Sequence, residues 1–160
     1  MSTLLSSDRV IDLSGTTKEE VLGELCKVVS RLPQVTDADK LLAAILKREA
    51  IMSTGIGMGI AIPHAKIESV TDMVMAVGRS QQGVEFSALD GRPVHLVILM
   101  AASNTQAEEF LKLLAKIGSF FVSENHRNRF LNAGSTEDIY RLFQHMDEHP
   151  RTGRDYAGHE

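Results

Sequence analysis

One histidine in this sequence stands where the backbone around it is expected to be rigid. His64 follows a stretch in which Gly55, Gly57 and Gly59 alternate with larger apolar residues. This spacing disfavours a helix, where each glycine costs about 1 kcal/mol, and it permits positive φ angles and close approach to a neighbour or a ligand. The short apolar run 60–62 is expected to enter a sheet, and the proline at 63 ends it. His64 is therefore predicted at a fixed corner, at the end of a strand.

The residue types around His64 leave its chemistry open. An imidazole in this setting could be a general base, a metal ligand or a nucleophile. No His-x-x-x-His or Cys-x-x-Cys spacing surrounds it, so a metal site is not indicated. A hydrogen-bonded histidine at a strand end, with no chemical role, is an equally good interpretation of the residues alone.

Two blocks of sequence extend this pattern. The first is Arg48-Glu49 followed by the run Ser-Thr-Gly-Ile-Gly-Met-Gly-Ile-Ala-Ile-Pro-His at 53–64, and the second is Asp-Gly-Arg-Pro-Val-His-Leu-Val at 90–97. Together they resemble the signature of the fructose/mannitol-type enzyme IIA domain of the bacterial phosphotransferase system, over roughly residues 5–146. The stand-alone nitrogen-regulatory IIA proteins are the members that the chain resembles most.

The resemblance implies a phosphohistidine carrier or regulator. His64 would accept a phosphoryl group from the phosphocarrier HPr or from its nitrogen-branch paralogue, and the phosphorylation state would control partner binding. Two alternatives stay open: a sugar-specific IIA component that passes phosphate to a IIB domain for sugar uptake, and a binding module that works without phosphorylation. The absence of fused B or C domains favours the regulatory role, with a transporter or a kinase as the kind of target.

The resemblance also assigns roles to residues near His64. Arg48 would stabilise the phosphoryl group, because its planar fork of donors suits phosphate oxygens; without such a role it is a favourable cation at a helix C-terminus. Supporting hydroxyl and backbone N–H groups would come from the preceding run: Ser53, Thr54, Gly55, Gly57 and Gly59. No cofactor and no metal are implied, and no P-loop for ATP is present.

One position departs from the family pattern. The family commonly carries a second histidine near the start of the long helix, in a Glu-His-Leu setting, where this chain has Glu109-Phe110-Leu111. Phe110 can neither donate a hydrogen bond nor carry charge, which puts efficient onward transfer to a IIB domain in doubt. His95 could stand in for the missing histidine, although a histidine bonded to backbone within a strand is the preferred interpretation.

Composition limits the other classes of function. The chain has 160 residues, 43% hydrophobic and 24% charged, as expected for about one domain, and its net charge of −4 gives no footprint for nucleic acid. It has neither a signal peptide nor the run of about 20 apolar residues that crosses a bilayer, so we expect a cytoplasmic protein without membrane insertion. The single cysteine, Cys26, is expected in the core. We expect one domain over 1–147 and a polar tail over 148–160.

The order of elements predicts an α/β (α+β) fold, with a mixed central β-sheet flanked by helices. The resemblance implies the same fold. Strands are expected at 10–13, 60–62, 72–79, 84–86 and 94–101. Helices are expected at 17–32, 36–49, 105–121, 123–131 and 135–146, with Thr17, Thr36, Thr105, Ser123 and Ser135 at their starts.

Overall fold

The long strand β6 (Val94–Ala102) lies in the middle of a six-stranded mixed sheet. In this computed structural model, residues 4–148 are described. Strand β5 (Val74–Val84) pairs with one side of β6 and is antiparallel to it, while β3 (Ile60–Ala61) and β4 (His64–Lys66) follow one another along the other side, both parallel to β6. The edges are β1 (Val10–Asp12), parallel to β5, and β2 (Gly55–Gly57), antiparallel to β3.

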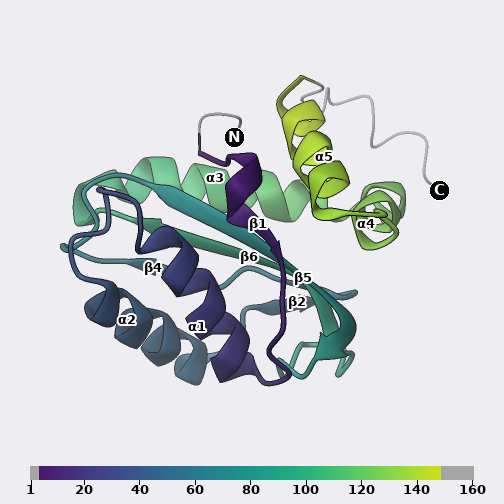
Figure 1. The fold of residues 1–160 in the computed structure, drawn as a ribbon, viewed down its shortest axis with the longest axis horizontal. Coiled ribbons are helices and arrows are strands. Elements are labelled where there is room, and N and C mark those ends of the chain that lie inside the picture. The colour runs from purple at the N-terminus through teal and green to yellow at the C-terminus, as the bar shows by residue number, and fades with distance from the viewer. Residues whose placement is uncertain (1–3, 149–160) are drawn as a thin grey trace.

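Helices cover both faces of this sheet (Figure 1). On one face lie α1 (Lys18–Val29) and α2 (Ala38–Ile51). On the other lie α3 (Ala107–Phe120), α4 (Glu124–Leu131) and α5 (Thr136–Glu148). Two short 3₁₀ helices, η1 (Ser7–Arg9) and η2 (Asn104–Gln106), precede β1 and α3. The mixed sheet flanked by helices confirms the predicted fold class.

Each face of the sheet has its own hydrophobic core. Alternate residues of β6 belong to different cores: Val97 and Leu99 pack with α1 and α2, while Leu96 and Ile98 pack with the helices opposite. A strand buried on both faces needs apolar residues at nearly every position, which explains the continuous run in β6. Cys26 lies in the first core and is buried, as predicted, and this burial raises the pKa of its thiol to about 12.

The helix starts were predicted only in part. Thr17, Ser123 and Ser135 accept hydrogen bonds from the backbone N–H groups three residues later, as their patterns indicate. Thr36 was the wrong start for α2: its hydroxyl donates to the carbonyl of Ser69, and Asp37 accepts from the N–H of Lys40 instead. A long-range partner for Thr36 therefore moves the start of the helix by one residue.

Two further boundaries were wrong. Strand β5 covers most of the segment expected at 72–79 and continues to Val84, so only the first residue of the strand expected at 84–86 belongs to it. The pairing of β5 with β6 shifts between Arg79 and Val84. Gly83 has a φ of +88° in this irregular part of the strand. Thr105 does not start the third helix, because Ser103 and Gln106 form a capping box that begins η2.

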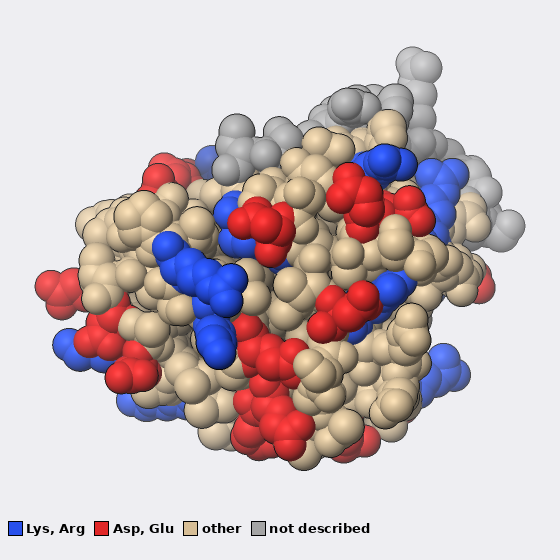
Figure 2. All heavy atoms as spheres, in the orientation of Figure 1, with Lys and Arg blue, Asp and Glu red and all other residues tan. Residues whose placement is uncertain are grey.

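The remaining features concern the ends and the surface of the chain. Among residues 4–148, no helix is long and apolar enough to span a membrane. Figure 2 shows acidic and basic side chains interspersed on one face of the molecule. The predicted polar tail, 148–160, lies outside the described residues apart from Glu148, which ends α5.

Candidate active site around His64

His64 lies at a corner that hydrogen bonds hold from both sides. Strand β3 ends at Ala61, and β4 begins at His64 after the Ile62-Pro63 pair. The N–H of Ile62 donates to the carbonyl of Thr54 over 3.0 Å, and the carbonyl of Pro63 accepts from the N–H of Met100 over 3.0 Å. Because these two bonds join the corner to both neighbouring segments, the backbone that carries the histidine is well fixed.

The imidazole of His64 is oriented by one hydrogen bond. Its Nδ1 lies 2.8 Å from the carbonyl oxygen of Ile62. A carbonyl oxygen can only accept, so Nδ1 carries the proton and the lone pair of the neutral ring is on Nε2. The side chain is half-buried. The ring therefore offers a nucleophilic Nε2 in a fixed tautomer.

The surroundings of His64 also favour the neutral ring. Burial lowers the pKa of His64 and is the main cause, and the positive charge of Arg48 lowers it further. The hydrogen bond to Ile62 and the charge of Glu49 act in the opposite direction, and the net result is a pKa below the usual 6.5. Near neutral pH the ring is thus in the form that can attack an electrophile.

This lowered pKa gives a prediction for pH dependence. We expect the imidazole C–H resonances of His64 to titrate below pH 6.5, and Arg48→Gln to raise that pKa because a nearby cation is removed. The sign follows from linkage: as pH falls below 6.5, the unfolded chain takes up the proton first, so stability decreases until the folded pKa is reached and stays at that lower level below it. An NMR titration checks both points, and a His64 pKa at or above 6.5 would contradict them.

A mostly apolar groove of about 640 Å³ opens beside His64, between α2, β4 and the start of α3. Three cationic side chains line it, and they come from α2 and β4: Lys47, Arg48 and Lys66. Its apolar lining includes Ile51 and Leu111, which are 75% and 68% exposed. A half-buried nucleophile thus faces a surface whose exposed apolar and basic groups suit a macromolecular partner that brings an anionic group.

Phe110, which departs from the family pattern described above, lies next to His64. The two ring centroids are 5.8 Å apart with the planes at 62°, an edge-to-face contact. Phe110 is only 6% exposed, so it forms an apolar wall for the imidazole. The site consequently has aromatic packing, and no hydrogen-bonding side chain, at this side of the imidazole.

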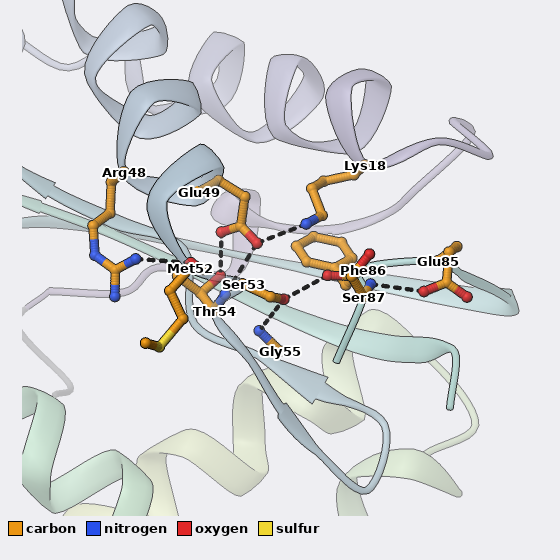
Figure 3. A network of polar contacts seen from close by, with 10 residues as sticks. All are labelled: Lys18, Arg48, Glu49, Met52, Ser53, Thr54, Gly55, Glu85, Phe86 and Ser87. Atoms are coloured by element: carbon orange, nitrogen blue, oxygen red, sulfur yellow. Dashed lines mark hydrogen bonds and ion pairs between the residues drawn. The ribbon is translucent and has the colours of Figure 1, made fainter. Parts of the chain in front are cut away.

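Arg48 lies at the C-terminal end of α2 and lines the same groove. Its guanidinium donates to the carbonyl of Met52 over 2.8 Å, which satisfies a carbonyl just beyond the helix end (Figure 3). The structure thus brings Arg48 and His64 to one groove, with the arginine bonded to backbone.

The predicted hydroxyl groups are engaged elsewhere in the structure. Ser53 donates to the carbonyl of Phe86, and Thr54 donates its hydroxyl to the carboxylate of Glu49 over 2.6 Å. Gly55 allows the close approach of a neighbouring segment, because a Cβ there would lie 2.8 Å from the Cβ of Ala88. These three residues hold the start of β2 in place.

Gly57, Gly59 and His95 lie away from His64. The two glycines flank Met58 at the tip of the β2–β3 hairpin, and Gly57, Met58 and Gly59 all have positive φ angles. His95 donates its backbone N–H to Gly59. It is five residues before Met100, the β6 partner of His64, which is about 16 Å along a strand. The structure therefore does not bring these residues to the candidate site.

His95 has the backbone partner that the sequence led us to prefer for it. Its Nδ1 lies 2.9 Å from the carbonyl of Ser80, on the neighbouring strand β5. The hairpin tip is also held by Asp90, which accepts from the N–H groups of Met58 and Arg92. These two donors hold the pKa of the Asp90 carboxyl below its usual range.

Glu49 is the residue of this site that the sequence reasoning missed. Its carboxylate is buried beneath the end of α2, bonded to Thr54 and paired with Lys18. The available signal was its position, since a carboxylate in the last turn of a helix opposes the helix dipole and needs a compensating partner. Among residues 4–148, no cluster of three or more His, Cys, Asp or Glu side chains is placed to hold a metal ion.

Comparisons with known proteins agree with this architecture. The family model for the phosphoenolpyruvate-dependent sugar phosphotransferase system, EIIA 2, matches residues 3–146. The chain is 36% identical over 138 residues to the fructose-specific EIIABC component of Bacillus subtilis strain 168, covering 86% of this chain and 22% of that protein. It is 32% identical over 133 residues to the nitrogen regulatory protein of Pseudomonas aeruginosa strain PAO1, covering 83% and 86%.

A solved structure is similar over most of the chain. The crystal structure of the nitrogen regulatory protein IIA-Ntr from Neisseria meningitidis superposes with a TM-score of 0.82 at 25% identity, covering 88% of this chain and 97% of that one. The fold, the family model and these relatives agree on one assignment. The chain belongs to the EIIA 2 family of the phosphoenolpyruvate-dependent sugar phosphotransferase system.

Proposed function

We propose that this protein is a phosphohistidine carrier or regulator that accepts a phosphoryl group on Nε2 of His64. The observation that carries the proposal is the hydrogen bond from Nδ1 to the carbonyl of Ile62, which leaves the Nε2 lone pair free beside the groove. The donor is a histidine-phosphorylated carrier of the HPr type, or its nitrogen-branch paralogue. The reaction takes place in the cytoplasm.

The proposed phosphoryl transfer forms one P–N bond and breaks another, so it needs no cofactor. The Nε2 lone pair forms a bond to phosphorus while the P–N bond of the donor breaks, and the donor imidazole keeps that electron pair. The Ile62 carbonyl stabilises the positive charge that develops on the His64 ring, because it accepts from Nδ1 throughout. Arg48 exchanges the carbonyl of Met52 for the phosphoryl oxygens, where its fork can form two charge-assisted bonds.

Phosphorylation changes the surface around His64 strongly. A phosphoryl group adds about −1.5 to −2 charges near pH 7. It would stand in a groove whose rim carries exposed apolar side chains, including Ile51 and Leu111, and the cations Lys47 and Lys66. A partner that docks on the unmodified surface meets a different charge after transfer, so the phosphorylation state can select between partners such as a transporter or a kinase.

Two alternatives use the same surface. A sugar-specific IIA component would pass the phosphoryl group to a IIB domain, and the similarity to a fructose-specific EIIABC protein supports this reading. A phosphorylation-independent binding module is favoured only by Phe110, which offers no hydrogen bond beside His64. Addition of a IIB domain to the phosphorylated protein separates the first alternative, since only a transport component would lose its phosphoryl group rapidly.

The proposal is tested by incubating the protein with phosphoenolpyruvate, enzyme I and HPr or its nitrogen-branch paralogue. We expect an acid-labile phosphoryl adduct by intact mass, absent from His64→Ala and kept by His126→Gln, whose ring stacks on Phe120 at another place in the fold. An adduct that persists in His64→Ala would refute the site. A folded wild-type protein that takes no phosphate from either donor would refute the carrier function.

We expect Phe110→His to raise the ratio of phosphorylated to unmodified protein at equilibrium with the donor by about tenfold, because a hydrogen bond to a charged group contributes about 1.5 kcal/mol or more. The histidine would stand beside the phosphoryl group at the place of the edge-to-face contact. Phe110→Leu is the matched control, since it alters packing without adding a donor. Quantitative intact mass measures all three proteins, and equal fractions in Phe110→His and Phe110→Leu would contradict the prediction.

A further inference from the structure

The carboxylate of Glu49 is buried near the C-terminal end of a helix, where a negative charge is unfavourable. Glu49 is 6% exposed and lies in the last turns of α2, where the helix dipole disfavours a negative charge. It is compensated by Lys18, whose Nζ lies 2.9 Å from Oε1 and also sits 5.1 Å from the centroid of the Phe86 ring. A buried ion pair is often no more stabilising than apolar residues of similar size, so stability alone is a weak reason for this arrangement.

Thr54 donates hydrogen bonds to both oxygens of the Glu49 carboxylate. Its backbone N–H donates to Oε1 over 3.0 Å, and its hydroxyl donates to Oε2 over 2.6 Å (Figure 3). Two donors from one residue to the two oxygens of one carboxylate fix both the position and the rotation of that residue. Thr54 is itself buried, so water cannot easily replace either bond.

Thr54 is joined to the imidazole of His64 by two further hydrogen bonds. The carbonyl of Thr54 accepts from the N–H of Ile62 over 3.0 Å, and the carbonyl of Ile62 accepts from Nδ1 of His64 over 2.8 Å. A continuous path therefore runs from Lys18 and Glu49 through Thr54 and Ile62 to His64. Each step in it is a direct contact between neighbouring groups.

We propose that Glu49 is a positioning residue for phosphoryl transfer, which through Thr54 and Ile62 holds the His64 ring in the tautomer and direction that present Nε2 to the groove. This inference rests on the proposed function for its effect on transfer, while its structural part concerns the free protein. Arg48 and Glu49 leave α2 in different directions (Figure 3), so adjacent residues serve the phosphoryl group and the imidazole separately.

The test is the tautomer of His64 in the folded protein, read from imidazole ¹⁵N shifts well above pH 6.5. We expect the wild type to be protonated at Nδ1, and Glu49→Gln to show a mixture of the two tautomers. Phosphoryl acceptance should fall about tenfold to a hundredfold, because small misplacements of a reacting group have effects of this size. Glu85→Gln is the matched control: that exposed carboxylate accepts the N–H of Ser87, a residue other than Thr54.

A second pair of variants covers the case in which Glu49→Gln fails to fold. Thr54→Val removes the hydroxyl donor and keeps the N–H, and it should shift the tautomer in the same direction, whereas Thr54→Ser should behave as the wild type. Folded variants with wild-type tautomer and wild-type transfer rates would overturn the inference, whatever their melting temperatures. A wild type that takes no phosphate, but whose tautomer depends on Glu49, would refute the proposed function and leave the positioning role intact.

Discussion

Arg48→Gln is expected to accept a phosphoryl group about a hundredfold more slowly than the wild type, as when a single preorganised donor is removed from a transfer site. Arg48 is the arginine of the groove, and its charge already acts on the ring of His64. Phe110, the residue in edge contact with the ring, cannot replace it. The rate is measured by quenched time points of the phosphoryl adduct, with the donor carrier held constant.

Two controls make this result specific to the guanidinium. Arg48→Lys keeps the charge but loses the planar fork, so its rate should fall between those of Arg48→Gln and the wild type. Arg141→Gln removes an exposed arginine of α5, whose partner Glu137 is 3.9 Å away, and should leave the rate unchanged. The loss of the bond to Met52 lowers stability by only about 1 kcal/mol, so equal rates in folded Arg48→Gln and wild type would refute the assigned role.

Lys18→Met should lower the free energy of unfolding by about 3 kcal/mol, because it leaves the carboxylate of Glu49 buried without a cation. The side chains of Lys18 and Glu49 are 17% and 4% exposed, so water can compensate the lost charge only slightly. Urea denaturation followed by circular dichroism gives the free energy. The exposed Arg141–Glu137 pair is the matched comparison, since Arg141→Met should change stability by less than about 0.5 kcal/mol.

A double variant separates the charge from the packing. Lys18→Met with Glu49→Gln removes the unpaired charge and keeps an amide oxygen that can accept from Thr54, so part of the lost stability should return. If Lys18→Met alone unfolds at the same urea concentration as the wild type, Glu49 does not depend on its cation. The unfolding measurement needs no phosphoryl donor, so it is independent of the proposed function.

Features that depend on neighbouring residues were predictable from the sequence. The corner at 62–64 follows from a proline directly after a short apolar run, and Thr17, Ser123 and Ser135 bond to groups three residues away. The motif of the family likewise places Arg48 and His64 close together in the chain, and the structure brings both to one groove. Their chemical roles stay predictions until phosphorylation is measured.

Features that depend on strand register were not predictable in the same way. Gly57 and Gly59 are closer to His64 in sequence than Thr54 is, yet the hairpin carries them away, because antiparallel pairing sets Thr54 opposite Ile62 and leaves the glycines at the tip. The parallel pairing of β4 with the far end of β6 likewise separates His95 from His64. A register of this kind is decided by pairing across the whole sheet.

The sequence by itself determined the fold class, the family and the segment that carries the candidate nucleophile, because local patterns and a nearly continuous motif contain that information. Only the tertiary structure decided that Phe110 contacts the ring of His64 and that Glu49 pairs with Lys18 and accepts from Thr54. Lys18 lies 31 residues before Glu49, and Phe110 lies 46 residues after His64. Contacts over such separations arise from how helices pack on the sheet, which no short stretch of sequence specifies.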